Sequence, residues 1–423
     1  MSIARYVAYD AYRTTSVPHL GIVPAHWEVR RLKYAALTTS EKVSSSTSPL
    51  PYIGMENVES WSGRILEGSS EVEGLATTFQ EGDVLFGKLR PYLAKVTKLS
   101  FSGICSSEFL VFKPHKQTSA DYLAYALRTP DFINLVNGST YGAKMPRANP
   151  KFIENAEIPF PPLSEQCAVA AFLDKKCAKI DEAVRIKEEQ IKLLRERRQI
   201  LIQQAVTRGL NPGVSMKDSG IDWIGQIPTH WKVRRGKYLF REVNERSAEG
   251  KEELLSVSHT TGVTARSEKN VNMFMAEDYT GSKVCQPGDV VINTMWAWMG
   301  ALGVSDLAGI VSPSYGVYRP KNRATFNRRF LEWLLRTTPF IEQYNRVSTG
   351  LHTSRLRLYP HMFLGLPIAF PDRDEQDVIV NHVNREAGKI DRAVSIKQDQ
   401  ITALKEYKTT LINATVTGKI KVI

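Results

Sequence analysis

KIDEAVRIKEEQI at residues 179–191 and KIDRAVSIKQDQI at residues 389–401 are two copies of one segment, and the first copy lies in a long stretch without helix breakers. Residues 165–207 contain neither proline nor glycine. At a rise of roughly 1.5 Å per residue, a helix over that stretch extends about 64 Å. The sequence therefore predicts one long helix around each copy.

Apolar residues in both stretches recur at alternating intervals of four and three residues, which is the spacing of a coiled coil. Both copies also place a cation at the same two positions of this seam, 187 and 198 in the first and 397 and 408 in the second. Polar seam residues fix helix register, so these matched cations favour two helices that pair with each other over two ordinary core helices. The predicted seam consists of Leu173, Ile180, Val184, Ile191, Leu194 and Leu201 in the first helix, and of Val383, Ile390, Val394, Ile401, Leu404 and Leu411 in the second.

The repeat extends outward from the long helices, and internal repeats of this kind define the architecture of a chain. Further matched segments keep the same order in both halves, with only small insertions. They are GIVPAHWEVRRLKY (21–34) with GQIPTHWKVRRGKY (225–238), EGDVLF (81–86) with PGDVVI (287–292), ICSSEFLVFKP (104–114) with IVSPSYGVYRP (310–320), and IPFPPLSEQ (158–166) with IAFPDRDEQ (368–376).

Each half begins with a mixed segment of strands and short helices. Short apolar runs such as DVLF, FLVF and GVYRP, separated by Gly, Ser and Pro, indicate strands. DYLAYALRT from Asp121 and RFLEWLLRT from Arg329 indicate short amphipathic helices. We therefore predict an α+β protein with two pseudo-repeated α/β domains, at residues 1–160 and 211–370, each followed by a long helix, at 161–210 and 371–423.

The composition is that of a globular, basic protein. The formal net charge is +12, which favours an anionic partner, first nucleic acid and then an acidic membrane surface. A basic protein without a nucleic-acid partner is the alternative. The four cysteines form no CxxC pair and are expected to be reduced thiols. No apolar segment is long enough for a signal peptide or a membrane span, so a soluble cytoplasmic protein is expected.

The order of these motifs resembles that of the specificity subunits of type I restriction–modification systems. The motifs that carry the resemblance are the IPxHWxVRR opening, the GD-apolar strand that continues in the first half as FGKLRPYLAKV, the proline-rich exit that ends in EQ, and the long KID helix. Each motif alone is modest, but their order and duplication are specific, and the resemblance covers nearly the whole chain.

The resemblance implies a non-catalytic DNA-recognition subunit. Each mixed domain would be a target-recognition domain that reads one half of a split, asymmetric site in double-stranded DNA. The long helices would pair as an antiparallel coiled coil that sets the spacing and docks two methyltransferase subunits, which restriction subunits would join. S-adenosylmethionine, ATP and Mg²⁺ would be held by those partners, and no cofactor by this chain.

Two polar loops of the first domain are candidates for DNA contact. Lys and Arg neutralise phosphates, whereas Arg with guanine and Asn or Gln with adenine are the commonest base pairings. In the second loop we expect Lys144 at a phosphate, Arg147 at a guanine and Asn149 at an adenine; a solvated surface loop is the alternative for both. The candidates are Lys88, Arg90 and Tyr92 after the GDVLF strand, and Tyr141, Lys144, Arg147 and Asn149 before the domain's exit.

The second domain has candidates at the matching places. NTMWAWMG at 293–300 replaces FGKLR, and its tryptophans would contact thymine methyls, stack on bases, or simply pack on one side of a core strand. STGLHTSRLR at 348–357 matches the second loop. The repeated pairs Arg30–Arg31 and Arg234–Arg235 would touch phosphate or a methyltransferase subunit, or only aid solubility. The second domain's candidates are Thr294, Trp296, Thr349, His352, Ser354, Arg355 and Arg357.

Motifs for catalysis are weak in this sequence. Asn149-Pro150-Lys151-Phe152 lacks the second proline of an amino-methyltransferase motif, and no glycine-rich cofactor loop accompanies it. The nearest acid-x-lysine after Pro371-Asp372 lies far away on the predicted seam, so a nuclease is not indicated. There is no phosphate-binding loop of the GxxxxGK[ST] type, and the histidines form no zinc motif, so no metal site is expected. The remaining alternative is a coiled-coil adaptor that binds proteins rather than DNA.

Overall fold

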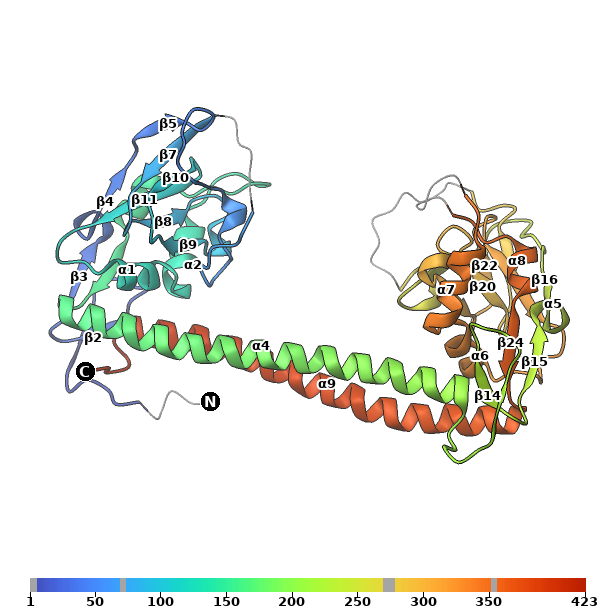
Figure 1. The fold of residues 1–423 in the computed structure, drawn as a ribbon. Helices are drawn as coiled ribbons and strands as arrows, with labels where there is room; N and C mark the ends of the chain where they lie inside the picture. Colours follow the sequence, from blue (N-terminus) through green and yellow to red (C-terminus); the bar gives the residue numbers. More distant parts are fainter. Residues whose placement is uncertain (1–5, 69–73, 269–277, 351–355) are drawn as a thin grey trace. The chain divides into compact units, whose positions relative to one another are not determined.

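A computed structural model describes residues 6–68, 74–268, 278–350 and 356–423 (Figure 1). The chain divides into two compact units, residues 1–189 with 397–423, and residues 190–396. Unit 1 and unit 2, as we call them, each contain part of both long helices. This division cuts through those helices, whereas the domain bounds expected from the sequence stop at their starts, so those bounds remain a prediction.

Two small sheets form the body of unit 1. The first has the antiparallel order β4-β11-β8-β9, and its buried residues pack against two helices, with the rings of Phe86 and Phe132 5.9 Å apart. The second has the order β5-β7-β10-β6 and a core around Phe79 and Val111. The apolar runs DVLF and FLVF form strands as predicted, and the structure pairs these two strands with each other. The elements are β4 (Ala36–Thr39), β5 (Lys42–Ser44), β6 (Tyr52–Ile53), β7 (Leu75–Phe79), β8 (Val84–Gly87), β9 (Val96–Lys98), β10 (Gly103–Ser106), β11 (Phe109–Pro114), α1 (Ala120–Leu127) and α2 (Pro130–Gly138).

Short ribbons and turns complete unit 1. The antiparallel pair β3–β12 joins the opening motif to the exit motif, and β1 pairs with β2. These elements are β1 (Tyr12–Thr14), β2 (Ile22–Pro24), β3 (Glu28–Arg31), β12 (Glu157–Phe160), α3 (Pro150–Asn155) and the short 3₁₀ helices η2 (Leu32–Tyr34), η3 (Met55–Asn57) and η4 (Pro91–Leu93).

Unit 2 repeats this plan. Its main sheet has the order β16-β23-β20-β21, which matches β4-β11-β8-β9 strand for strand, and β15–β24 matches β3–β12. The elements are β13 (Met216–Asp218), β14 (Gln226–Pro228), β15 (Lys232–Arg235), α5 (Gly236–Leu239), β16 (Phe240–Glu242), β17 (Leu255–Ser258), β18 (Gly262–Ala265), β19 (Lys283–Cys285), β20 (Val290–Ile292), η5 (Ala297–Met299), β21 (Leu302–Val304), β22 (Gly309–Val311), β23 (Gly316–Pro320), α6 (Arg328–Leu335), α7 (Thr338–Val347), α8 (Pro360–Gly365) and β24 (Pro367–Phe370). The prediction of two pseudo-repeated domains is confirmed.

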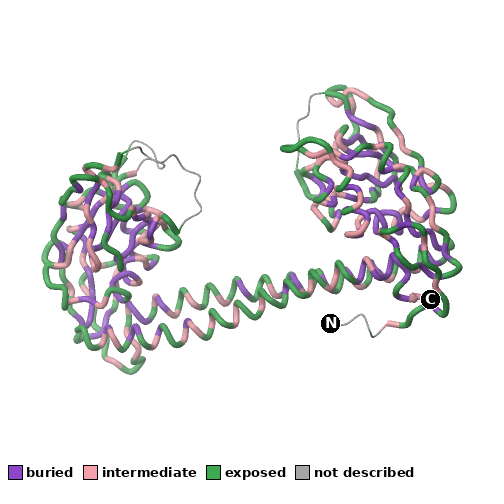
Figure 2. The backbone as a smooth tube through the Cα atoms, turned by 180° about the vertical axis from the view of Figure 1, so that it is seen from behind, coloured by how far each residue is buried: buried purple, intermediate pink, exposed green. Residues whose placement is uncertain are grey.

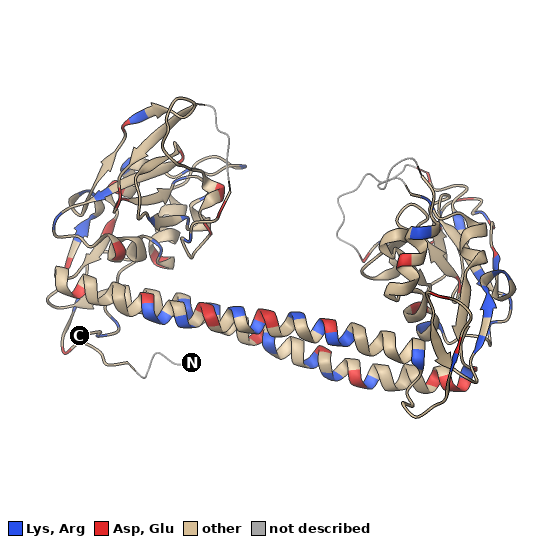
Figure 3. Ribbon diagram, viewed as in Figure 1, with Lys and Arg blue, Asp and Glu red and all other residues tan. Residues whose placement is uncertain are grey.

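The predicted long helices are α4 (Leu163–Arg208) and α9 (Arg373–Val416). Every predicted seam residue is buried or half-buried, while charged residues cover the outer faces (Figures 2 and 3). In unit 1, Lys408 donates to Asp181 at 2.7 Å and Lys187 donates to Gln400 at 2.7 Å, so the helices run antiparallel. In unit 2, Arg198 bonds Asp391, 3.0 Å apart, which is the repeat equivalent of Asp181–Lys408. The seam cations Lys187, Arg198 and Lys408 are therefore matched by polar partners on the opposite helix.

The repeated HW and EQ motifs fasten each domain to its long helix. In unit 1, Glu165 at the start of α4 accepts hydrogen bonds from the Trp27 indole and the Tyr9 hydroxyl, both at 2.9 Å, and pairs with His26 at 2.6 Å. In unit 2, Glu375 accepts from the Trp231 indole at 3.2 Å and pairs with His230 at 2.7 Å. The repeated histidine thus has a structural partner in both units.

The side-chain amide of the glutamine in each EQ motif binds main-chain groups just before α1 or α6 and just before the long helix itself. Gln166 donates to the carbonyls of Gln117 and Pro161 and accepts from the Ser119 amide. Gln376 makes the equivalent three bonds, to Thr325, Pro371 and Asn327.

Among the described residues, no helix is long and apolar enough to cross a membrane.

Candidate nucleic-acid interface

The two candidate loops of unit 1, predicted separately from the sequence, lie side by side. Leu89 forms a β-bridge with Arg147, and the Arg90 amide donates to the Pro146 carbonyl at 2.7 Å. The Ala148 amide donates to the Lys88 carbonyl at 2.9 Å. These bonds join the loop after β8 to the loop before α3, so the two form one surface, which we call reading surface 1.

Exposed cations and aromatic rings cover reading surface 1. Arg90 and Lys144 are exposed, and the Arg90 guanidinium lies 3.5 Å from the Lys144 carbonyl. Tyr92 and Tyr141 are 45% and 63% exposed. The surface also includes Met145, 49% exposed, which sequence reasoning missed because an isolated methionine carries no signal for DNA binding. Long cationic side chains beside rings suit a phosphate backbone and the base edges of a groove.

Arg147 and Asn149 are already engaged within the domain. The Arg147 guanidinium makes a two-pronged ion pair with Glu108, with its Nη2 atom 2.9 Å from Oε1, and this pairing raises the pKa of Arg147. The Asn149 side-chain oxygen accepts from the Lys151 amide at 2.9 Å and caps α3. Base contacts by these two residues stay a prediction, and they would have to compete with the internal partners.

Unit 2 joins the matching loops in the same way. The Leu358 amide donates to the Thr294 carbonyl at 2.9 Å, and Thr349 and Arg357 exchange two backbone hydrogen bonds. Thr294 is buried, and its hydroxyl donates to the Ser314 carbonyl, so this side chain supports the loop. Thr349 and Arg357 are exposed. His352, Ser354 and Arg355 lie outside the described residues.

Reading surface 2, formed by these loops of unit 2, differs chemically from reading surface 1. Met295 and Trp296 are 40% and 51% exposed. Leu89 and Arg90 occupy the corresponding positions in the matching loop of unit 1. The interpretation of residues 295–298 as one side of a strand is wrong, because β20 ends at Ile292 and η5 begins at Ala297. A 3₁₀ turn does not alternate its side chains, so Trp296 points into solvent while Ala297 is buried.

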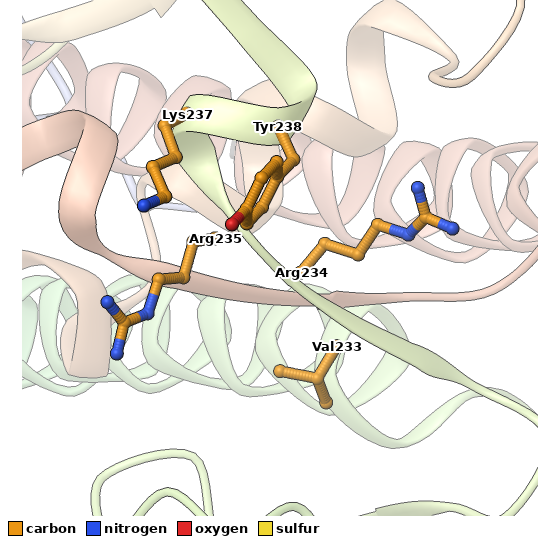
Figure 4. A pocket seen from close by; sticks show the side chains of 5 residues that line it. All are labelled: Val233, Arg234, Arg235, Lys237 and Tyr238. Carbon is orange, nitrogen blue, oxygen red and sulfur yellow. The ribbon is translucent and has the colours of Figure 1, made fainter.

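A repeated basic face lies on β3 and η2 in unit 1 and on β15 and α5 in unit 2. In unit 2 it forms a shallow hollow of about 400 Å³ lined by Arg234, Arg235, Lys237, Tyr238 and Val233. Figure 4 shows Arg235 and Lys237 on one side of the Tyr238 ring and Arg234 on the other. No ion pair within the described part of the chain reaches these three cations. In unit 1, Arg30 pairs with Glu28 at 2.7 Å, and Tyr34 is as exposed as Tyr238.

No group of His, Cys, Asp and Glu side chains suited to a metal ion occurs among the described residues. Burial raises the pKa of the Cys105 and Cys285 thiols to about 12, which disfavours the reactive thiolate form. The exposed positions of the two loop surfaces are cations and aromatic rings, which is the composition of a nucleic-acid-binding surface.

Comparison with known proteins agrees with this geometry. Residues 27–193 match the family model described as type I restriction modification DNA specificity domain. The type I restriction enzyme MjaVIII specificity subunit of Methanocaldococcus jannaschii is 24% identical over 437 aligned residues, which cover 95% of this chain and 94% of that protein. The EcoDI specificity subunit of Escherichia coli is 26% identical over 168 residues, 38% of this chain and 36% of that protein.

Two solved structures share the fold over most of the chain. A structure described as "Structural basis underlying complex assembly and conformational transition of the type I R-M system" superposes with a TM-score of 0.69 at 18% identity, and covers 93% of this chain and 98% of its own. The HsdS subunit of Thermoanaerobacter tengcongensis gives 0.54 at 19% identity, with coverage of 94% and 98%. Family model, relatives and fold thus agree that this chain is similar to type I restriction–modification specificity subunits.

Proposed function

We propose that the chain is the DNA-reading subunit of a type I enzyme, in which each domain reads one half of a split site in double-stranded DNA. The observation that carries the proposal is the pair of reading surfaces. They are built by equivalent loops with equivalent backbone hydrogen bonds, yet they carry different side chains. One scaffold with two sets of exposed residues is what an asymmetric, two-part site requires.

The proposal assigns the long helices to spacing and docking. α4 is one continuous helix of 46 residues, about 69 Å at the usual rise, so the distance between two readers would be a property of the helix pair. Ile186, Leu193 and Ile200 recur every seventh residue and are 42%, 58% and 56% exposed. Seven-residue spacing places them on one face, outside the seam. An exposed apolar stripe of this kind suits a helix of a partner subunit.

The partners in this proposal are two methyltransferase subunits, with restriction subunits added to that core. Features that both units share, such as the basic face with Arg234 and Arg235, suit a partner present twice or the uniform phosphate backbone. The chain itself is proposed to be non-catalytic, with S-adenosylmethionine, ATP and Mg²⁺ held by the partner subunits. A coiled-coil adaptor for proteins is the competing function, and it would show no salt-dependent DNA affinity.

The test is DNA binding by the complex of this chain with its methyltransferase, measured over a salt series on the methylated motif and on a scrambled duplex. We expect Lys144→Ala to weaken binding to both the methylated motif and the scrambled duplex. The slope of log affinity against log salt concentration should fall by roughly one, because one phosphate contact and its counterion are lost. Lys116→Ala is the matched control. Lys116 is exposed and follows the C-terminal end of β11, whereas Glu108, the partner of Arg147 on reading surface 1, precedes the N-terminal end of that strand. Binding without preference for the motif would contradict the proposal.

A further inference from the structure

Backbone strain in unit 1 is concentrated beside reading surface 1. Within the described parts of the chain, the non-glycine residues with positive φ are Trp61 (63°), Arg90 (49°) and Ala94 (48°). Arg90 and Ala94 flank η4, and the Trp61 amide donates to the Ala94 carbonyl at 3.3 Å. Left-handed backbone is costly for residues with a side chain, and such strain tends to occur where function demands a particular side-chain position. The three residues thus form one strained patch.

Trp61 lies at the tip of a tight turn that sequence reasoning missed. Val58 bridges Ile65, and the Glu59 amide donates to the Arg64 carbonyl at 2.9 Å, which closes the turn. The indole is 42% exposed at a place where an apolar ring gains little from folding. Gly63, at a φ of 70°, lies so close to the Val96 carbonyl that a Cβ would meet it at 2.1 Å. The turn therefore rests directly on β9, next to η4.

The arginine that follows α1 binds the turn that carries Trp61. Arg128 follows α1, stacks over the Tyr125 ring at 4.9 Å, and donates from its guanidinium to the Ser62 carbonyl. The Nε atom of Arg128 is buried, and this burial lowers the pKa of Arg128. Removing a guanidinium group from water costs free energy, and here the group is held by the carbonyl of an exposed turn. This arrangement indicates that the position of the turn tip is important.

Unit 2 contains the same device with different tip residues. Arg336 follows α6 and donates to the carbonyls of His259 and Thr260, between β17 and β18. Gly262, at a φ of 67°, lies beside Gly303 of β21, the equivalent of β9, and a Cβ on Gly262 would meet the Glu332 carboxylate of α6. The exposed tip residues here are His259, Thr260 and Thr261. The arginine and the glycine are the same in both units, whereas the tip side chains differ, as they do on the two reading surfaces.

We infer that these two tips are additional DNA-contacting elements, with Trp61 making an apolar contact in the groove of the half-site read by unit 1. This inference rests on the proposed function and extends it. Arg128 and Arg336 are positioning residues, which act on DNA only through the tip. An indole can press against thymine methyls or an unstacked base step without neutralising a phosphate.

The experiment uses the assembled methyltransferase complex and the two duplexes described above. Trp61→Ala should lower affinity for the motif by about tenfold, as loss of an aromatic anchor does, and leave the scrambled duplex nearly unaffected. Its salt slope should stay that of the wild type, because no counterion is involved. Arg128→Gln should lose part of the same preference, and the double variant should lose no more than Trp61→Ala alone. Arg336→Gln is the matched variant, and it should relax only the other half of the methylated motif.

Unchanged affinity of Trp61→Ala for the motif, or an equal loss on both duplexes, would overturn the inference while leaving the proposed function intact. A wild-type complex that does not prefer the motif would overturn both. Thermal unfolding of Trp61→Ala should stay close to that of the wild type because Trp61 is exposed at the tip of a turn and lies outside the buried clusters of unit 1. A shifted unfolding temperature that accounts for the lost binding would also count against a DNA contact.

Discussion

Glu165 shows how one residue can hold a domain to a helix. Burial alone would raise the pKa of its carboxyl, but the hydrogen bonds from Trp27, His26 and Tyr9 outweigh burial and lower the pKa below its ordinary value. The carboxylate is thus stabilised in the folded chain relative to the unfolded chain. Its contribution to stability is present above the unfolded pKa and is lost as the pH falls through the lower, folded pKa.

This sign gives a pH-dependent prediction. Glu165→Gln should lower the free energy of unfolding by roughly 2 kcal/mol at pH 7, because charge-assisted hydrogen bonds are lost. The loss should be smaller at pH 3, below the ordinary pKa of a glutamate, because the carboxyl of the unfolded chain is then protonated. Denaturant unfolding at both pH values measures the difference. Glu188→Gln is the control. This residue of α4 is exposed, and its ion pair with Lys405 is long, with 3.7 Å between the amino nitrogen and the carboxylate oxygen. An equal loss at both pH values would contradict the account.

Residue roles were only partly predictable from the sequence. The type and spacing of Lys88, Arg90 and Lys144 indicated an exposed basic loop, and all but the half-buried Lys88 are exposed. The internal partner of Arg147 was not predictable, because Glu108 is distant in sequence and reaches it only through strand pairing. Trp61 was missed for the same reason. Its exposure and its contact with Ala94 depend on a turn whose backbone no local pattern specifies.

At the scale of elements, the seam and the outer stripe of α4 make separable contributions. Ile180 is buried in a cluster with Leu173 and Leu411, whereas Ile186 is 42% exposed on the same helix. Both are isoleucines within two turns of each other, so they have the same intrinsic helix propensity. They differ in what they touch.

Ile180→Asp should therefore destabilise unit 1 by about 3–5 kcal/mol, because an unpaired carboxylate is placed in an apolar cluster. Ile186→Asp should leave the unfolding free energy within about 0.5 kcal/mol of the wild type but weaken capture of the methyltransferase subunit. Chemical denaturation and size-exclusion chromatography of the purified complex measure the two effects. If Ile186→Asp assembled normally, the stripe would not be a docking surface.

The sequence predicted elements best where a period was sustained. The four-three spacing located both long helices and every seam residue. Short elements with less than two turns or a few residues of strand, such as α3, β5 and η4, were not predicted, because their boundaries depend on the neighbours they pack against. The strand suggested for residues 295–298 failed because an alternating sequence of only four residues does not exclude a 3₁₀ turn, in which burial does not alternate.

For the whole molecule, the internal repeat is the feature from which the account follows. Clamps that are the same in both units, such as Glu165 and Glu375, support the fold. Surfaces that differ, such as Arg90 with Lys144 against Met295 with Trp296, are assigned to reading two different half-sites. The repeat was visible in the sequence, but the division of labour between its shared and divergent positions emerged only when both units were compared in space.

A domain exchange tests the central claim most directly. Residues 25–155 are replaced by the equivalent segment of another specificity subunit, the variant is expressed with its methyltransferase, and the methylated motif is read by sequencing genomic DNA of the host. The account predicts a split motif in which one half changes while the other half and the spacer stay as in the wild type. A motif that changes in both halves, or in neither, would contradict it.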